Sequence, residues 1–164
     1  QKTAYEIVDC DWSSGVCSSD LTVRLGTAPD PRLAAAVAGD LQALTVGVLG
    51  KRAELTAVAV QFVEPSQWFI GGRALDGAGP PSAFVEIRIS AGSNTEAQIA
   101  EYVAAVHAAL RTALGGLHEV SYVQVQEVPA AHWGWGGRTQ AARDRKSTRL
   151  NSSHSQQSRM PSSA

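Results

Sequence analysis

Two stretches of the chain, QWFIGGRAL at residues 67–75 and HWGWGGRTQ at residues 132–140, share the pattern Trp-x-x-Gly-Gly-Arg. Upstream of them, TVRLGTA at residues 22–28 aligns with EIRISAG at residues 86–92, so the two offsets of 65 and 64 residues differ by one position. Duplication over this length predicts one supersecondary unit used twice. The sequence therefore divides into a first repeat, a linker and a second repeat, at residues 22–75, 76–82 and 83–140.

The first repeat has the pattern of a β-α-β unit. Residues 22–25 form a short β-prone run. Asp30 followed by Pro31 predicts a helix start, because aspartate accepts hydrogen bonds at an N-cap and proline suits the first helical position. Apolar side chains then recur at helical spacing until Gly50, a suitable helix end, at Leu33, Val37, Leu41, Leu44 and Val48. Residues 55–63, LTAVAVQFV, predict the second strand.

The second repeat has the same order of elements. Residues 83–89 predict a strand, and Ser93 with Glu96 three positions later has the form of a capping box. The helix that follows ends at the glycine pair 115–116, and residues 120–128 predict the last strand. The apolar stripe of this second helix consists of Ile99, Val103, Val106, Leu110 and Leu114.

These elements predict an α+β fold of two layers. A β-α-β crossover makes the two strands of each repeat parallel and places the helix on one face of the sheet. Two repeats side by side give a four-stranded mixed sheet with both helices on the same face. We expect alternate valines and alanines on the opposite face, which other subunits would cover. The two Trp-x-x-Gly-Gly-Arg segments follow the second strand of each repeat and are placed to reach a neighbour's sheet edge.

Both ends of the chain lack this periodicity. Residues 144–147, DRKS, can be encoded by GATCGGAAGAGC, and its reverse complement in another frame encodes the sequence from Cys17 into Leu21. The relation continues to both termini with one base changed, at Gly15. We therefore interpret residues 1–21 and 144–164 as translated sequencing adapter, disordered in the protein. The alternative is a pair of natural disordered tails.

On this interpretation the natural part is residues 22–143, a single domain of 122 residues without cysteine. This fits a cytoplasmic protein. The formal net charge of −1 argues against a nucleic-acid binder, which normally has a basic excess. No apolar run approaches the roughly 18 residues of a membrane span, so we expect no membrane partner.

The order and spacing of the motifs resemble the tautomerase superfamily, specifically the two-repeat branch similar to macrophage migration inhibitory factor and to 4-oxalocrotonate tautomerase. The resemblance covers residues 22–140. It rests on the LGK turn at residues 49–51 and on SAG at residues 90–92. It rests equally on the Tyr-x-Gln pattern at residues 122–124 and on WGW at residues 133–135.

This resemblance implies a homotrimer with sites between subunits, a small carboxylated substrate, and no cofactor or metal. It also implies catalysis by an amino-terminal proline, whose secondary amine can lose its charge near neutral pH in an apolar, positively charged pocket. That amine would move a proton between enol and keto forms. Here no proline precedes Thr22, so we expect this chain to be inactive and to contain no catalytic residue.

Five residues are candidates for substrate binding. Lys51 matches the family's basic residue after the first helix, and the ordinary alternative is a solvated lysine at a helix C-terminus. Arg73 and Arg138 occupy equivalent positions of the two repeats, which favours a shared architectural role over a catalytic one. Tyr122 matches a pocket tyrosine of the family, and Gln124 stands where relatives have asparagine.

Other polar and aromatic residues have less specific interpretations. Arg24 and Arg88 lie on the first strand of each repeat and point either into a site or into a buried structural pair. The tryptophans Trp68, Trp133 and Trp135 line a substrate pocket or, by preference, pack at an interface. The histidines His107, His118 and His132 have no third ligand at metal-binding spacing.

Three function hypotheses follow. The first is a tautomerase or isomerase of small carboxylated enols. The second is a non-catalytic binding or structural member of the same fold. The third is an unrelated ferredoxin-like binding domain built from a duplicated β-α-β unit.

Overall fold

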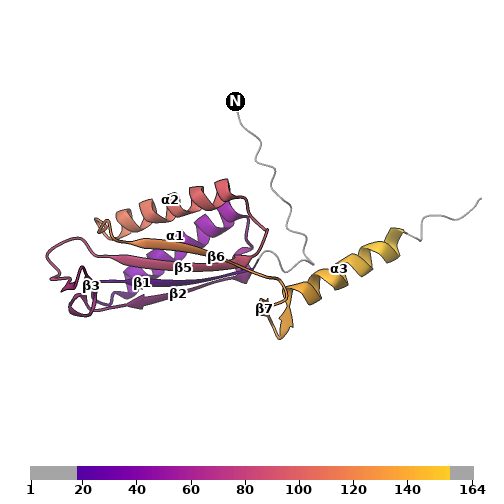
Figure 1. The fold of residues 1–164 in the computed structure, drawn as a ribbon, viewed down its shortest axis with the longest axis horizontal. Coiled ribbons are helices and arrows are strands. Elements are labelled where there is room, and N and C mark those ends of the chain that lie inside the picture. Colours follow the sequence, from indigo (N-terminus) through magenta and orange to yellow (C-terminus); the bar gives the residue numbers. More distant parts are fainter. Residues whose placement is uncertain (1–17, 156–164) are drawn as a thin grey trace, which may run out of the picture.

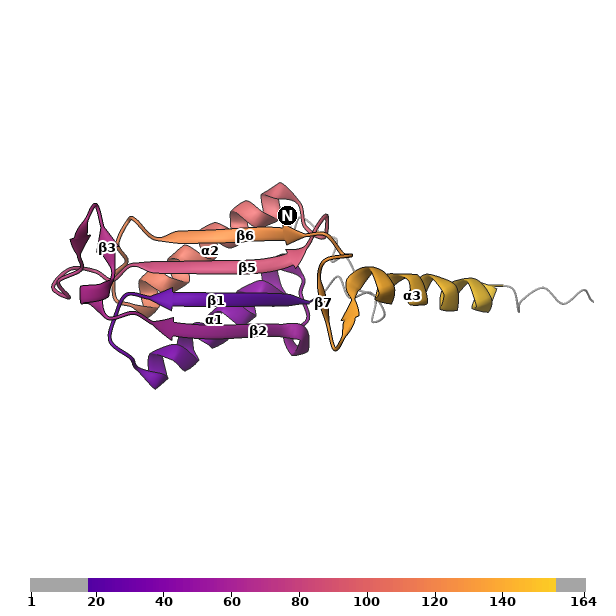
Figure 2. The same ribbon diagram turned by 60° about the horizontal axis from the view of Figure 1, so that its bottom comes forward.

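The computed structural model of the chain describes residues 18–155, which form a four-stranded sheet covered on one face by two long helices (Figures 1 and 2). Across the sheet the strand order is β2-β1-β5-β6. The strands are β1 (Ser19–Leu25), β2 (Thr56–Phe62), β5 (Ala83–Ser90) and β6 (Tyr122–Val128). The two covering helices are α1 (Pro31–Leu49) and α2 (Glu96–Ala113). The predicted two-layer α+β fold is confirmed.

The sheet is built around the antiparallel pair β1 and β5. Within each repeat the strands are parallel, β1 with β2 and β5 with β6, as the β-α-β pattern predicts. The two repeats meet where β1 runs antiparallel to β5, with Leu21 opposite Ile87 and Val23 opposite Val85. This pairing gives the sheet an approximate twofold symmetry. At each end of the sheet, one repeat starts its strands and the other repeat ends its strands.

Helix α1 begins and ends where the sequence predicts. The Asp30 carboxylate accepts hydrogen bonds from the backbone N–H groups of Arg32 and Leu33, at 2.9 and 3.3 Å, and Pro31 is the first helical residue. Gly50 ends the helix in the left-handed conformation, with a φ of 65°. Glycine takes up this conformation without the steric cost that a Cβ atom would add.

The start of α2 differs from the prediction. The N-cap is Thr95, whose hydroxyl accepts a hydrogen bond from the Gln98 N–H at 3.2 Å, while the Gln98 side chain accepts from the Thr95 N–H at 2.9 Å. The expected capping box of Ser93 and Glu96 is therefore wrong. The Ser93 hydroxyl has other partners, the ammonium of Lys51 and the Ser90 carbonyl, and is not available for capping.

The core lies between the helices and the inner face of the two central strands. Both β1 and β5 alternate between buried and half-buried residues, and the buried set faces the helices. One polar pair lies within this core: Tyr102 of α2 and Thr45 of α1 join their hydroxyl groups at 2.9 Å. The buried apolar residues are Leu21, Val23, Leu25, Val37, Leu41, Leu49, Ala83, Val85, Ile87, Ile89, Tyr102, Val106 and Leu110.

Helix α1 is more apolar than the sequence argument allowed. Over its 19 residues the mean hydropathy reaches 1.3 in the best window, so its length and composition alone would permit it to cross a membrane. The expectation that no such segment exists was therefore wrong. Its position explains the composition, because Val37, Leu41 and Leu49 are buried against the sheet and α2. Apart from Thr45, which is also buried, the other side chains of α1 are half-buried or exposed, as in a helix that packs on a sheet through one face.

The outer face of the sheet is more polar than expected. Val58 and Val60 of β2 and Val123 and Val125 of β6 pack toward the helices, and Ala57, Ala59 and the glutamines of these strands face outward. The centre of the outer face holds two ion pairs, Arg24 with Glu86 at 3.2 Å and Arg88 with Asp20 at 3.0 Å. Arg24 and Arg88 are thus partly exposed partners of carboxylates, which is neither of the two roles considered for them.

Strand β1 starts three residues before the predicted run at residue 22. Ser19 pairs with Thr56 and with Ile89, and Leu21 is fully buried in the core. The alternation of buried and half-buried side chains continues through these residues without a break. The first 17 residues, which include most of the segment interpreted as adapter, lie outside the described part of the chain.

Each repeat ends in a short hairpin, and the chain continues into a third helix. The elements are the 3-10 turns Ala53–Leu55 and Pro65–Gln67, the hairpin β3 (Phe69–Ile70) with β4 (Arg73–Ala74), the hairpin β7 (Gly134–Trp135) with β8 (Arg138–Thr139), and α3 (Gln140–Ser155). Helix α3 extends away from the sheet (Figure 1).

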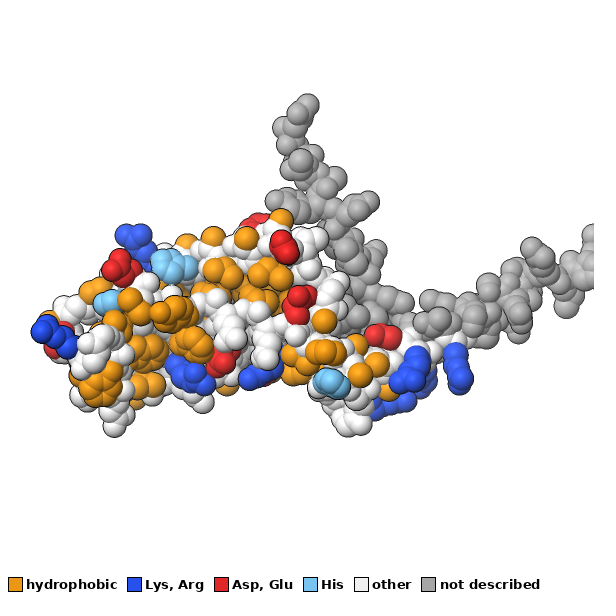
Figure 3. Space-filling view, in the orientation of Figure 1, with side chains coloured by type: hydrophobic (Ala, Val, Ile, Leu, Met, Phe, Trp, Pro, Cys, Tyr) orange, Lys and Arg blue, Asp and Glu red, His pale blue; other side chains and the backbone are white. Residues whose placement is uncertain are grey.

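The tail that was expected to be disordered from residue 144 is helical as far as Ser155, because α3 spans Gln140–Ser155. Basic side chains gather along it in Figure 3, among them Arg145, Lys146 and Arg149.

Candidate functional site

Lys51 is buried at the end of the sheet where β1 and β2 begin. It follows Gly50, whose left-handed conformation turns the chain from α1 toward β2. The Lys51 N–H donates to the Thr45 carbonyl at 3.3 Å, and only 3% of the residue is exposed. The sequence offered a solvated helix-terminal lysine as the ordinary alternative, and the burial of Lys51 excludes it.

The Lys51 ammonium is held by the loop between β5 and α2. Its Nζ donates to Ser93 Oγ at 2.7 Å, and this hydroxyl donates in turn to the Ser90 carbonyl at 2.6 Å. The same loop is tied to α1, because Asn94 Nδ2 donates to the Leu49 carbonyl at 2.9 Å. The ammonium position is therefore set by both repeats, α1 from the first and the loop at residues 90–95 from the second.

Burial lowers the pKa of Lys51 to about 8, and the negative charge of Glu127 partly opposes this shift. Desolvation has this effect because it disfavours the charged form of an amine. Glu127 is itself oriented by the Gly92 N–H, which donates to its Oε1 at 2.9 Å. Near neutral pH Lys51 is still mostly a cation, and it is less strongly hydrated than a surface lysine. Such a group suits a carboxylate partner.

The start of β1 lies at this same end of the sheet. Ser18 Oγ accepts hydrogen bonds from Trp133 Nε1, at 3.2 Å, and from Gln140 Nε2. Ser19 Oγ lies 3.0 Å from Thr56 Oγ1. Ser90 Oγ is buried and has no hydrogen-bond partner among the described residues. The strand start is therefore surrounded by hydroxyl groups and by the indole of Trp133.

The other substrate-binding candidates do not meet Lys51 within one chain. Tyr122 begins β6 at the opposite end of the sheet, because it pairs with Phe84 and β5 runs antiparallel to β1. Of its surface, 61% is exposed. Its ring packs edge-on against Phe84, with 6.3 Å between the ring centroids. Gln124 lies two residues further along β6 and is exposed on the outer face. One subunit alone therefore does not assemble the expected site.

The two equivalent arginines also lie at opposite ends. Arg73 is on β4, in the hairpin that ends the first repeat. Arg138 is on β8, in the hairpin that follows the second, where it lines a hollow together with Asp144 and Arg145 of α3. The two arginines thus occupy equivalent strands of the two hairpins.

The tryptophans contribute to packing. Trp68 closes over Gly26, where a Cβ atom would lie 3.2 Å from the indole. Trp135 carries the Arg143 guanidinium over its ring, with the Cζ atom 3.8 Å from the ring centroid. Trp133 reaches the start of β1 through its hydrogen bond to Ser18. Trp133 and Trp135 belong to the hairpin at the Lys51 end, and Trp133 contacts the start of β1.

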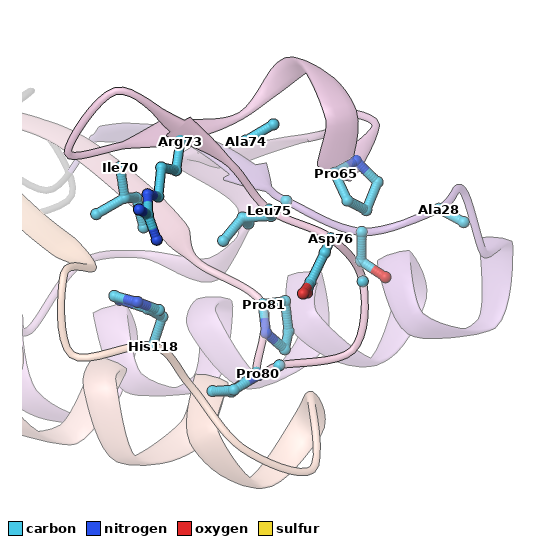
Figure 4. A pocket seen from close by; sticks show the side chains of 14 residues that line it. Ala28, Pro65, Ile70, Arg73, Ala74, Leu75, Asp76, Pro80, Pro81 and His118 are labelled. Carbon is cyan, nitrogen blue, oxygen red and sulfur yellow. The ribbon is translucent and has the colours of Figure 1, made fainter.

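A second hollow of about 670 Å³ lies at the far end of the sheet, opposite the Lys51 end (Figure 4). Arg73 and His118 line it from different repeats, together with prolines of the linker at residues 76–82. The sequence argument considered His118 only as a metal ligand. The internal repeat relates Lys51 to the glycine pair 115–116 in the turn after α2, two positions before His118, so it points to this turn and not to His118 itself.

Comparison with known proteins finds similarity in structure only. No protein-family model and no curated protein matches the sequence. A native fused 4-OT superposes with a TM-score of 0.68 at 25% identity, covering 75% of this chain and 97% of that one. A fused 4-OT solved as a symmetric trimer gives 0.66 at 21% identity, covering 75% and 97%. Macrophage migration inhibitory factor from Toxoplasma gondii gives 0.59 at 24% identity, covering 73% and 98%.

Proposed function

The chain has the two-repeat fold of the tautomerase superfamily, and from this premise we propose that the natural protein is a cofactor-free tautomerase or isomerase of small carboxylated enols. The strand order, with β1 paired to β2 inside one repeat, and the superposition on fused 4-OT favour this over an unrelated ferredoxin-like domain. The reaction would exchange a proton between an enol oxygen and a carbon atom next to a carbonyl group.

The observation that carries this proposal is the buried ammonium of Lys51 beside the start of β1. A carboxylate bound there would lose its contacts with water and gain a contact with the Lys51 ammonium, whose position is fixed by its hydrogen bond to Ser93. The substrate carbon would then lie near the first residue of the strand. A secondary amine at that point, uncharged in this desolvated and cationic environment, could remove a proton and return it elsewhere.

This chain has no proline at that point. Ser19, Asp20 and Leu21 begin β1, and the next residue is Thr22. A chain that continues before the strand has an amide there, and an amide nitrogen cannot act as a base. We therefore propose that the chain as written is inactive, and that the catalytic amine belongs to a natural N-terminus that the adapter sequence replaces.

The natural domain is proposed to comprise residues 22–143, with residues 1–21 and 144–164 derived from adapter. These 122 residues are about three quarters of the 164, which is also the share of the chain that fused 4-OT covers. Sequencing the gene across both junctions from independent DNA would test this. Natural codons for DRKSTRLNSSH after Arg143 in that DNA would refute it.

A homotrimer is proposed as the active assembly. Fused 4-OT has been solved as a trimer, and the outer face of this sheet leaves Tyr122 exposed. Tyr122 and Gln124 lie in the first half of β6, and Lys51 of the same chain lies at the end of the sheet where β6 finishes. We therefore propose that they reach the site of a neighbouring subunit. Sedimentation analysis would measure the assembly, and a stable monomer would contradict the proposal.

The decisive experiment restores a proline at the start of β1. Two shortened chains are needed, each of which begins with proline once its initiator methionine has been removed. In one the proline stands at position 19, and in the other it directly precedes Thr22. Ketonisation of phenylenolpyruvate and of 2-hydroxymuconate is then followed by absorbance. We expect activity from at least one shortened chain and none from the full chain. In the active chain, Lys51→Met should raise KM for these carboxylates.

The outcomes separate the two remaining hypotheses. Activity in the chain as written would disprove the need for the proline. A folded, trimeric, proline-bearing chain that binds the substrates without turnover would favour the non-catalytic binding member of the fold. A chain that neither binds nor converts these carboxylated enols would refute the proposed substrate class.

A further inference from the structure

We propose that the far end of the sheet holds a second binding site, for a small organic carboxylate with an apolar body, between Arg73 and His118. This site is separate from the Lys51 site and does not depend on the proposed enzymatic function. Its hollow of about 670 Å³ falls within the range of about 300–1,000 Å³ that is usual for small-molecule sites.

The twofold arrangement of the repeats explains why a hollow forms there. At the Lys51 end, the turn after α1 faces the loop after β5. At the far end, the turn after α2, which carries His118, faces the loop after β1, which begins with Gly26. As at the Lys51 end of this chain, a peptide bond precedes the strand, because the linker continues directly into β5 through Pro81 and Ser82. The far end therefore has no place for a terminal amine, and we assign it a binding role.

Two cationic or donor groups face this hollow from different repeats. Arg73 extends from the β3–β4 hairpin toward His118 in Figure 4, and it forms no ion pair with any residue of the described range 18–155. His118 Nδ1 accepts a hydrogen bond from the Val120 N–H at 3.0 Å. Because Nδ1 is the acceptor, neutral His118 carries its proton on Nε2, which is then a donor. A carboxylate between them would receive hydrogen bonds from a guanidinium and an imidazole.

The remaining wall of the hollow is mostly apolar. Pro65, Ile70, Leu75, Pro80 and Pro81 contribute side chains to it. This surface would contact a ring or a short hydrocarbon body and exclude water from it. It therefore favours an organic carboxylate over inorganic phosphate, which has no apolar part.

Asp76 restricts where the ligand's charge can lie. Its carboxylate lines the same hollow, and its Oδ1 accepts a hydrogen bond from the Ala78 N–H at 2.9 Å within the linker. A ligand carboxylate next to it would be repelled. The anionic end of the ligand is therefore placed beside Arg73 and His118.

The hollow is already formed by backbone contacts of the linker. The Gly26 N–H donates to the Ser82 carbonyl at 2.8 Å, and the His118 N–H donates to the Pro81 carbonyl at 2.8 Å. On the hairpin side, the Leu75 N–H donates to the Trp68 carbonyl at 2.9 Å. These bonds connect the three segments that line the site, so little ordering is needed when a ligand binds.

The test is an amide-resolved NMR titration of the full chain with benzoate, and with benzamide as the neutral analogue. We expect benzoate to shift the amides of residues 26–28, 73–79 and 118, and benzamide to bind more weakly. Arg73→Gln should weaken benzoate binding about tenfold, as expected for the loss of a charge-assisted hydrogen bond. His118→Asn keeps an acceptor for the Val120 N–H, removes the Nε2 donor, and should weaken binding by a smaller factor.

The matched control is Arg138→Gln, the equivalent arginine of the second repeat, which should leave benzoate affinity at the far end unchanged. Benzoate shifts confined to the surroundings of Lys51 would overturn the proposal. So would an Arg73→Gln variant that folds and binds benzoate as the parent does, or equal binding of benzoate and benzamide. Tautomerase activity is not a readout here, so failure of this site and failure of the proposed function are distinguishable.

Discussion

The hydroxyl of Tyr102 on α2 lies 2.9 Å from the hydroxyl of Thr45 on α1, in the core between the two repeats. Thr45 Oγ1 donates to the Leu41 carbonyl at 2.7 Å, so it must accept the proton of Tyr102. This hydrogen bond connects the two helices directly, and both residues are fully buried.

A double-mutant cycle would measure this connection. Tyr102→Phe should lower the free energy of unfolding by about 1–2 kcal/mol, and Thr45→Val by about 1–3 kcal/mol because it leaves the Tyr102 hydroxyl buried without a partner. The double variant should lose less than the sum of the two. Urea unfolding at one fixed protein concentration would measure this. Strict additivity would show that the two hydroxyls do not interact.

The lowered pKa of Lys51 should make the free energy of unfolding depend on pH in an unusual way. Its pKa falls from the ordinary 10.5 to about 8 on folding, so between these values the unfolded chain binds more protons than the folded chain. The free energy of unfolding should therefore rise as the pH increases from about 8 to 10.5, by on the order of 3 kcal/mol. Below pH 8 the full cost of burying the ammonium remains.

Lys51→Met is the variant that tests this. It keeps an apolar stem and removes the charge, so it should be more stable than the parent near pH 7 and should lose the rise between pH 8 and 10.5. Chemical unfolding across this pH range would measure both effects. If the variant kept the same rise, the titrating group would have to be another residue.

Two glycines should respond in opposite ways to alanine. A Cβ atom at Gly26 would lie 3.1 Å from the Leu75 side chain and 3.2 Å from both Trp68 and the Ser82 carbonyl. Gly26→Ala should therefore destabilise the fold by about 1–3 kcal/mol. Gly39 lies within α1 with nothing near its Cβ position, so Gly39→Ala should stabilise by about 0.5–1 kcal/mol. Thermal unfolding of both would show the opposite signs, and shifts of the same sign would contradict the packing around Gly26.

The loop before α2 separates capping from the positioning of Lys51. Thr95→Ala removes the N-cap and should cost about 1 kcal/mol of stability at any pH near neutral. Ser93→Ala leaves the cap intact and removes one acceptor of the Lys51 ammonium, so it should lower the pKa of Lys51 further. The pH profile of unfolding distinguishes the two, because only Ser93→Ala should move its midpoint. Identical profiles would mean that Ser93 does not hold Lys51.

Local signals in the sequence predicted most of the fold. The cap of Asp30 with Pro31, the end of α1 at Gly50 and the parallel pairing inside each repeat all depend on neighbouring residues, and all are confirmed. The cap of α2 was missed because Ser93 is used by Lys51, a residue 42 positions away. Tertiary contacts of this kind leave no trace in local spacing.

The site was less predictable for the same reason. Lys51 was identified through a resemblance, and its burial depends on a loop of the other repeat. The distance of Tyr122 from Lys51 follows from the antiparallel pairing of β1 and β5. The predicted mixed sheet implies this pairing, but matching single residues to a family does not take it into account. The role of His118 depends on which group meets it across the linker, and only the folded chain brings Arg73 there.

The antiparallel meeting of β1 and β5 has a consequence for how such a molecule can change over time. In an assembly of identical single units, one substitution alters every copy of a site at once. Here the two ends of the sheet are encoded by different codons, so a mutation at residue 51 leaves residues 115–118 untouched. A repeat within one chain thus leaves one end free to change or to acquire a new ligand while the other keeps its residues. The two turns indeed differ, since the turn after α1 carries Lys51 and the turn after α2 carries the glycine pair 115–116 and His118.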